Sequence, residues 1–561
     1  MELKASPLLR RLEKLKTAYG NDAPGQKLDL LALLERRRLQ KAAEVYRLHE
    51  VLCFLHAYPD SKPILHQVEQ MLAGFSRRTD LIRHHRALAN TGIAGTTIYY
   101  SFFSPTAQWI VKRFPDCLTI DWADLDNKDK LVDLLPFLLP YSESYALEML
   151  SYSAQEWLER LKGNRETDAA FLVRRFASYG AGSVTREKLY DELDIPMRLV
   201  SGRGTPTRTN VKFAGLSEVF HDRPLARVRP DLRQEMRRPP LRVRTLSPRE
   251  GQRLIDMAVE TMITHARDLD AFAYGDKNSV TLVDCGQGMQ FATMGMIPER
   301  RYLLESVCGF LALTNGVPIG YVGAVSLFNS AEINYNVFET FRGAEAALIF
   351  GRALAVAHHL FGAATISIDP YQLGHDNTEG LQSGAWWFYY KLGFRPEDSN
   401  VRRHVRSELR RLRTNPRYRS SVSTLQKLTS VPMFLYLHQT KQDVLSKMSL
   451  GEVGLKISRL LADRFGADRE KGVRTLSREA ARLLGVRSQR SWSVSERQAW
   501  ERWSPLILTL PSIARWKTAE KRALAEVARA KGGRHESDYL TLFNRHRRLR
   551  RAILKLGEEA S

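Results

Sequence analysis

One stretch of the sequence, residues 332–396, constrains the fold more than any other. It begins EINYNVFETFRGAEAALIFGRALAVAHHLFGAATISID and, after a polar loop, ends SGAWWFYYKLGFRP. Polar and apolar residues alternate over 332–338, which predicts a strand, and apolar residues recur at helical spacing over 344–361. A second strand at 364–368 and a short aromatic helix at 385–392 follow. A strand, a turn and a helix in this order bring unpaired N–H groups to a helix N-terminus, a place that favours phosphate.

The residues before this stretch continue the same pattern. Strands are predicted at 241–246, 280–283, 290–294, 309–314 and 319–322, with Asn315-Gly316 as a hairpin turn. A helix is predicted to start at Ser247-Pro248. Together these elements predict a mixed α/β domain over residues 241–400.

The rest of the chain predicts helices on both sides of that domain. A chain of 561 residues is too long for one ordinary core, so we expect several domains. Residues 1–221 are predicted to be mainly helical, with a long helical pattern over 28–58. Residues 222–240 are rich in Arg and Pro, which is typical of a linker. Residues 401–561 again predict helices.

The positive charge is concentrated in the last of these regions. The net charge is +23, yet residues 1–400 contain 49 Lys and Arg against 47 Asp and Glu, while residues 401–561 contain 36 against 15. Such a region favours polyanions, so we expect a nucleic acid or an acidic protein as its partner. Four tryptophans in this region could stack nucleic-acid bases or fill a core: Trp492, Trp500, Trp503 and Trp516.

The sequence also argues against a disulfide framework, a secretory signal, a membrane span and a metal site. The four cysteines are widely spaced without a CxxC pair, which suits a reducing compartment, and no secretory signal is visible, so a cytoplasmic location is expected. The longest uncharged run, 87–111, is too polar for a membrane span. The segment His49-Glu50-Val51-Leu52-Cys53 lacks the second histidine of a zinc-binding HExxH motif, so no metal site is expected there or elsewhere.

Two motifs in the central stretch carry a resemblance to a known family. Arg342, Gly343 and Ala347 match a pyrophosphate-binding turn, although Glu345 stands where that turn usually has glycine. Ala385, Tyr389, Leu392, Gly393 and Phe394 match an aromatic helix without a gap. The stretch resembles the acyl-CoA-binding half of the GNAT (Gcn5-related) N-acetyltransferase fold. The resemblance implies that acetyl-CoA or another acyl-CoA binds through Val337, Phe338, Arg342, Gly343, Ala344, Glu345, Ala346 and Ala347.

The resemblance also implies a catalytic acid and a base. Tyr389 falls where the family places the tyrosine that protonates the departing thiolate, a reasonable task for a phenol. It could also be a core aromatic, and Tyr390 is its alternative if the register shifts by one. Glu332, Glu339 and His375 are candidate bases for activating an amine acceptor. Glu332 shares a strand face with Asn334 and Asn336, which predicts either a polar pocket or a solvated face.

Three functions follow from these patterns. The first is an acyl-CoA-dependent N-acyltransferase that works by direct attack of the amine on the thioester. The second, favoured by Glu345, is a GNAT-like scaffold that has lost CoA and binds a polyanion through its basic region. The third is transfer of an aminoacyl or other acyl group from a charged carrier such as tRNA, which would bring a steep salt dependence.

Overall fold

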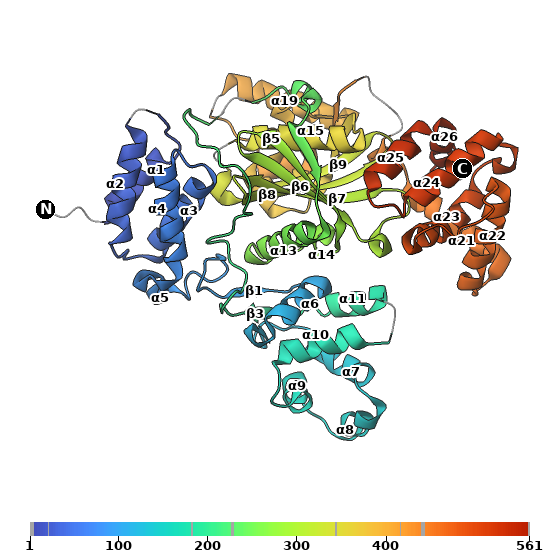
Figure 1. Ribbon diagram of the computed structural model, residues 1–561, viewed down its shortest axis with the longest axis horizontal. Helices are drawn as coiled ribbons and strands as arrows, with labels where there is room; N and C mark the ends of the chain where they lie inside the picture. Colours follow the sequence, from blue (N-terminus) through green and yellow to red (C-terminus); the bar gives the residue numbers. More distant parts are fainter. Residues whose placement is uncertain are drawn as a thin grey trace. The chain divides into compact units, whose positions relative to one another are not determined.

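The computed structural model describes residues 5–20, 22–180, 183–225, 229–342, 345–415, 417–438 and 444–558 (Figure 1). The chain forms two compact units. The first comprises Met1–Leu225, Gln252–Tyr274 and Thr314–Ile319, and the second comprises Ala226–Gly251, Gly275–Leu313 and Gly320–Ser561. Each unit is built from separated parts of the chain, whereas the sequence pattern predicted consecutive domains.

Helices form most of the first unit. Their bounds are α1 Ala5–Leu15, α2 Ala23–Glu35, α3 Ala42–Ala57, α4 Lys62–Ala73, α5 Thr79–His84, α6 Ser104–Arg113, α7 Lys128–Leu138, α8 Ser144–Met149, α9 Ala154–Lys162, α10 Asp168–Ser178, α11 Ser183–Asp191, α13 Pro248–Thr264 (mostly in this unit) and α14 Asp270–Ala273. The helical pattern over 28–58 is divided between α2 and α3. Arg78 donates hydrogen bonds to the carbonyls of Glu35 and Arg37, and the carboxylate of Asp80 accepts one from the N–H of Leu39. These contacts fix the segment between the two helices in a non-helical path.

The first unit also contains a small sheet that the sequence pattern did not predict. Its strands are β1 Ile98–Tyr100, β2 Leu118–Ile120 and β3 Met197–Leu199, and β3 lies between the other two, antiparallel to both. Strands of three residues are too short for a visible alternation, and their pairing joins segments about a hundred residues apart in the chain. Neither signal is present in a local window of sequence.

A nine-stranded mixed sheet dominates the second unit, in the order β11-β12-β10-β9-β8-β7-β6-β5-β4. The strand bounds are β4 Arg242–Thr245, β5 Gly275–Gly286, β6 Met289–Met296, β7 Ser306–Thr314, β8 Val317–Leu327, β9 Ser330–Val337, β10 Thr365–Ile368, β11 Arg395–Pro396 and β12 Met433–Tyr436. Every strand predicted between residues 241 and 368 is confirmed in place, and several are longer than predicted. β9 and β10 run parallel, and α15 (Ala346–Phe361) connects them.

Helix α15 begins two residues later than predicted and ends as predicted. Its C-cap is Gly362 in the left-handed region (φ 66°), whose N–H donates to the carbonyl of His358. Helix α12 (Leu232–Arg237) packs on α15 and buries Leu232 and Met236. The segment 222–240, interpreted as a linker, therefore contains a helix that joins the core. The six-residue helix was not predicted because the segment is rich in Arg and Pro and because the helix is stabilised mainly by packing against distant residues.

The sheet continues beyond residue 400, where the α/β domain was predicted to end. After α18 (Ala385–Lys391), α19 (Ser399–Thr414) and α20 (Val422–Leu428), the chain returns as β12 and inserts between β10 and β11. The prediction of helices alone after residue 398 is wrong for this strand. A four-residue apolar run does not show by itself that the sheet has a vacant edge to accept it.

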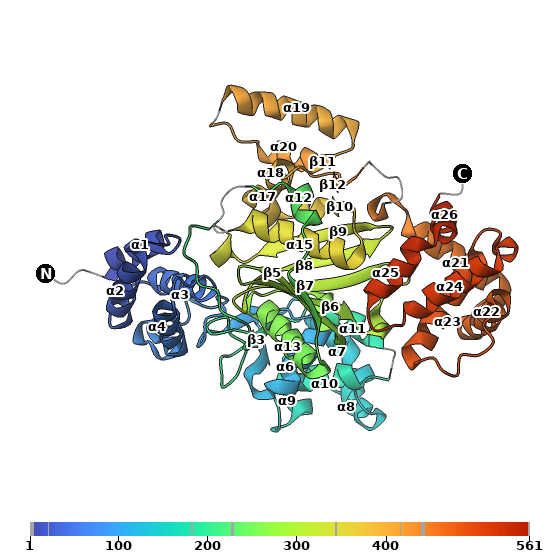
Figure 2. The same cartoon turned by 45° about the horizontal axis from the view of Figure 1, so that its top comes forward.

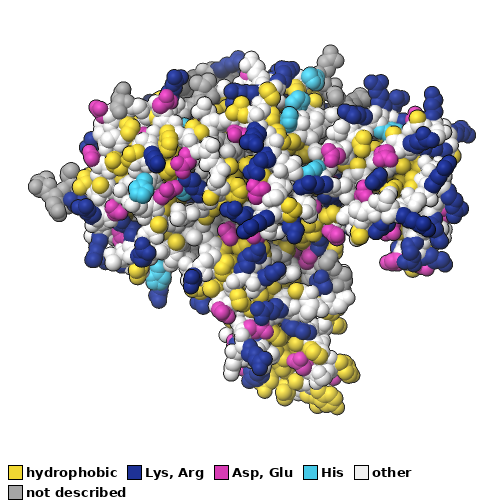
Figure 3. Space-filling model, viewed as in Figure 1, with side chains coloured by type: hydrophobic (Ala, Val, Ile, Leu, Met, Phe, Trp, Pro, Cys, Tyr) yellow, Lys and Arg dark blue, Asp and Glu magenta, His cyan; other side chains and the backbone are white. Residues whose placement is uncertain are grey.

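The remaining helices complete the second unit. They are α21 Leu450–Phe465, α22 Arg469–Leu484, α23 Val494–Thr509, α24 Thr518–Ala530, α25 Glu536–Arg545 and α26 Arg547–Leu556. Trp500, Trp503 and Trp516 are buried among them, and Trp492 packs edge-on against Trp500. Three of the four tryptophans therefore belong to a core, and Trp492 is half-buried beside it. Most of the basic residues lie on the outside, where Figure 3 shows Lys and Arg side chains crowded over the C-terminal helices, whereas Lys531 is buried.

Candidate functional site

Strand β9 presents one polar face, as its alternation predicted. Glu332, Asn334 and Asn336 are half-buried, whereas Ile333, Tyr335 and Val337 on the other face are buried. On the polar face, β9 pairs in register with Val325, Gly323 and Tyr321 of β8. The polar row is therefore set among neighbouring strand residues and only partly open to solvent.

The pairing of the parallel strands β9 and β10 ends partway along this row. Their pairing covers three positions, from Ser330 with Thr365 to Glu332 with Ser367, and no further pair exists among the described residues. β9 continues to Val337, while β10 ends at Ile368, one residue beyond its last partner on β9. This end of the pairing is called the separation of β9 and β10 below. The backbone of β9 beyond Glu332 thus has no strand neighbour on this side, and its polar groups need other partners.

One of these partners is the side chain of Gln372, which leads to Tyr389. The amide nitrogen Nε2 of Gln372 lies 2.8 Å from the carbonyl oxygen of Tyr335 and 3.3 Å from the phenol oxygen of Tyr389. Gln372 belongs to α16 (Pro370–Leu373), the short helix that follows β10. The separation of the strands, the glutamine and the tyrosine predicted as an acid therefore lie together.

Tyr389 is held firmly and stays protonated. Its ring packs edge-on against Phe350 and Phe394, and 2% of the residue is exposed. Burial raises the pKa of its phenol well above the ordinary value. Gln372 donates to the phenol oxygen, and no acceptor for the phenol proton is present among the described residues. Tyr389 can therefore still donate its own hydrogen, as a general acid must.

The neighbouring tyrosine has a different environment. Tyr390 stacks on Trp386 with ring centroids 5.1 Å apart and lies under the guanidinium of Arg395. The close contact with Gln372 belongs to Tyr389, the residue that the pattern of 385–394 singled out.

Glu332 is the candidate base with a perturbed carboxyl group. Burial, reinforced by the nearby Asp369, raises the pKa of Glu332 to about 6. Its side chain has no hydrogen bond or ion pair within the described part of the chain. Asp369 caps α16 by accepting from the N–H of Tyr371 at 2.8 Å. A carboxylate with a pKa near 6 is well suited to accept a proton at neutral pH.

The other two candidate bases lie at the surface. Glu339 is exposed in a single 3-10 turn, Glu339–Phe341, after β9. His375 is exposed in the loop after α16, and its Nε2 lies 3.7 Å from the carboxylate of Asp376. The sequence could not rank the three candidates because it did not show which one the fold buries.

The start of α15 is the predicted anion site. Glu345 is the N-cap of this helix, and its side chain makes no capping hydrogen bond to the first turn, which contains Ala346 and Ala347. Arg342 donates through Nε to the carbonyl of Val337 (3.1 Å) and through Nη2 to the carboxylate of Glu379 (2.7 Å). Phe338, the last predicted contact before the turn, is buried beside Tyr321. Gly343 and Ala344 lie outside the described residues.

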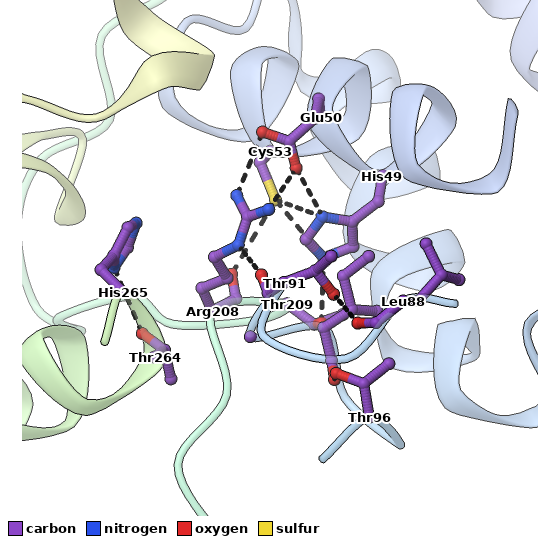
Figure 4. A network of polar contacts seen from close by, with 12 residues as sticks. His49, Glu50, Cys53, Leu88, Thr91, Thr96, Arg208, Thr209, Thr264 and His265 are labelled. Atoms are coloured by element: carbon purple, nitrogen blue, oxygen red, sulfur yellow. Dashed lines mark hydrogen bonds and ion pairs between the residues drawn. The ribbon is translucent and has the colours of Figure 1, made fainter. Parts of the chain in front are cut away.

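A second polar cluster lies in the first unit (Figure 4). The guanidinium of Arg208 pairs with Glu50 at 2.6 Å, and His49 contacts both Glu50 (3.1 Å) and the hydroxyl of Thr209 (2.9 Å). The thiol of Cys53 lies 3.7 Å from the ring nitrogens of His49.

The side chains of this cluster are not activated for catalysis. Burial raises the pKa of the Cys53 thiol and lowers that of His49, so neither a thiolate nor an imidazolium forms readily. The pair of Arg208 with Glu50 ties a loop to α3, 158 positions away in the chain. That distance explains why the sequence showed the His49 segment but not its partners.

The comparisons with known proteins add no relative. No family model, no curated protein and no solved structure matches the chain. Within the described ranges, no helix is long and apolar enough to cross a membrane. Among these described residues, no three His, Cys, Asp or Glu side chains lie close enough together to hold a metal ion. The geometry of the second unit is therefore the basis for a functional proposal.

Proposed function

We propose that the protein is an acyl-CoA-dependent N-acyltransferase that resembles the GNAT family. The observation that carries the proposal is the separation of β9 and β10 beside the buried phenol of Tyr389. In the resembling family, two strands in this position part to admit the pantetheine arm of CoA. Here the same sequence of strand, helix and strand is present, and the pairing stops after three residue pairs because β10 ends at Ile368.

The side chains around the separation can supply acid and base. In the proposed reaction, the amine nitrogen attacks the thioester carbonyl carbon, a C–N bond forms, and the C–S bond breaks. Glu332 would take one proton from the acceptor ammonium before the attack, because its pKa of about 6 leaves it mostly ionised at neutral pH. The nitrogen would lose a second proton to solvent as the amide forms. Tyr389 would give its proton to the departing thiolate.

The start of α15 fits the diphosphate of CoA. Its first-turn N–H groups are not capped by the side chain of Glu345, and the positive end of the helix dipole lies there. Arg342 lies next to this turn, and its ion pair with Glu379 is exposed on both sides (45% and 53%). An exposed pair of this kind contributes little, about 0–1 kcal/mol, so a phosphate could take over the guanidinium.

The first experiment is a calorimetric titration of the full-length protein with acetyl-CoA. Binding is expected, and Arg342→Ala should weaken it. Thiol release in the presence of a panel of amines then measures transfer. Tyr389→Phe should lower the rate at least tenfold without changing acetyl-CoA affinity, because removing a general acid costs about 10²–10⁴ in rate. Tyr371→Phe, on an exposed tyrosine of α16, is the matched control and should leave the rate unchanged.

A second candidate function is supported by the charges at the turn. Glu345 is the N-cap residue of the helix, and the carboxylate of Glu379 pairs with Arg342, so two acidic residues belong to the neighbourhood of the proposed diphosphate site. These charges favour a scaffold that no longer binds CoA. An absence of acetyl-CoA binding at millimolar concentration would favour the scaffold and contradict the acyltransferase.

A further inference from the structure

A cavity of about 560 Å³ lies where α18, β11, α19 and β12 meet, in the second unit. Its volume is in the range of small-molecule sites. It is lined by three aromatic residues, by Glu397, and by four arginines: Arg233, Arg395, Arg402 and Arg406. The proposed acyl transfer uses none of these residues, and Figure 2 shows α19 as an outer layer above this part of the sheet.

One wall of the cavity is a stack of three planar groups. Trp386 and Tyr390 lie almost parallel, with an interplanar angle of 12°, and the guanidinium carbon of Arg395 lies 4.0 Å from the centre of the Tyr390 ring. The Nη1 atom of Arg395 donates to the carbonyls of Tyr390 and Phe394, at 2.7 Å each. The guanidinium is therefore held over the ring. Such a plane can stack a nucleic-acid base on its outer face.

Strand β12, on which Phe434 is the cross-strand partner of Arg395, supplies further aromatic surface next to this wall, and Glu397 supplies one acidic group. Phe434 and Tyr436 are stacked with ring centroids 6.1 Å apart. The carboxylate of Glu397 accepts from the hydroxyl of Tyr436 at 2.6 Å and pairs with Lys447 at 2.7 Å. These partners hold the pKa of Glu397 below its usual range. Its negative charge is paired mainly with Lys447, and the positive charge of Arg402 also lies close enough to help lower this pKa.

Two of the arginines are available for an anion. Arg402 and Arg406 are exposed and lie one turn apart on α19. Neither guanidinium makes a hydrogen bond or an ion pair with any residue that the structure describes. The buried acid on this helix, Glu408, accepts instead from Tyr418 and Ser420. Guanidinium groups recognise phosphate by paired hydrogen bonds, so this pair suits a phosphate better than a carbonyl or an amide.

We propose that this cavity binds a nucleoside phosphate, with the base stacked on Arg395 and the phosphate held by Arg402 and Arg406. The ligand is either a free nucleotide or one nucleotide of a single-stranded nucleic acid. Arg403, Arg410 and Arg413 continue the exposed basic surface of α19 beyond the cavity, where the adjacent phosphates of a strand would lie. Binding through several phosphates makes affinity fall steeply with salt.

The test uses the full-length protein and two probes. A fluorescein-labelled single-stranded RNA of twelve nucleotides is followed by anisotropy, and ADP is followed by calorimetry. Arg402→Ala/Arg406→Ala should lower the affinity of the bound probe at least tenfold. The matched control is Arg547→Ala/Arg551→Ala, which removes two exposed arginines with the same spacing from α26 and should change affinity less than threefold.

Arg395→Lys tests the stacking apart from the charge. It keeps the positive charge but loses the plane, and it should lower affinity about fivefold or more, as expected for the loss of one stacked base. Binding of RNA but not ADP assigns the cavity to a strand, and binding of both with competition assigns it to free nucleotides as well. An equal loss in the α26 control, wild-type affinity in Arg395→Lys, or binding of neither probe would overturn the proposal.

The affinity for acetyl-CoA tests whether this cavity is independent of the proposed acyltransferase site. The affinity of the Arg402→Ala/Arg406→Ala variant for acetyl-CoA should equal that of the wild type. A parallel loss of acetyl-CoA binding would assign the cavity to the nucleotide of the cofactor and would overturn an independent site. A failure to bind acetyl-CoA in the wild type would refute the acyltransferase and leave the RNA and ADP results valid.

Discussion

The substitution Glu332→Gln should stabilise the protein at alkaline pH. The fold raises the pKa of Glu332 to about 6 from an ordinary 4.5. A difference of about 1.5 pKa units corresponds to about 2 kcal/mol. Because the folded-state pKa is the higher one, the fold favours the neutral carboxyl, and this contribution is lost as the pH rises from about 4.5 through 6. At pH 8 the wild type therefore carries a buried charge that glutamine does not.

Thermal unfolding by differential scanning calorimetry measures this effect. At pH 8 the transition of the second unit in Glu332→Gln should lie about 2–5 °C above the wild type, and at pH 5 less than half of that gain should remain. Glu339→Gln is the matched control, since Glu339 lies seven residues away and is exposed. A gain that is equal at both pH values, or that appears in the control, would refute the placement of Glu332 in a buried, anion-disfavouring position.

Three further outcomes follow from the packing and the charges. Asp369→Asn should move the acidic limb of the pH–rate profile for thiol release below pH 6, because Asp369 helps to raise the pKa of Glu332. Lys27→Met should lower the free energy of unfolding of the first unit, measured in urea, by about 3–5 kcal/mol, because Lys27 and Asp60 are both buried and pair at 2.7 Å. Leu232→Ala should cost about 2–5 kcal/mol in the second unit, measured in the same way, since Leu232 is 2% exposed; an unchanged midpoint would mean that α12 does not pack on α15.

The sequence predicted the elements whose signals are local. The alternation of β9 and the glycine that ends α15 follow from side-chain period and backbone freedom within a few residues. The elements that were missed depend on distant partners. β12 is a strand because β10 and β11 flank it, and α12 is stable because it packs on α15.

In the candidate site, too, local patterns were predicted and long-range contacts were not. The pattern of the aromatic helix selected Tyr389, which the structure places beside the separation of β9 and β10. The contact of Gln372 with Tyr389 joins the helices α16 and α18, 17 positions apart in the chain, and no spacing rule predicts it. The choice among Glu332, Glu339 and His375 depends on burial, which the tertiary structure decides.

The most direct measurement is an experimental structure of the protein bound to CoA. The account predicts that the pantetheine arm lies between β9 and β10 beyond Glu332, with the thiol within hydrogen-bonding distance of the phenol of Tyr389 and the diphosphate at the start of α15. A structure in which Gln372 keeps its hydrogen bond to the carbonyl of Tyr335 and CoA binds elsewhere, or not at all, would contradict it.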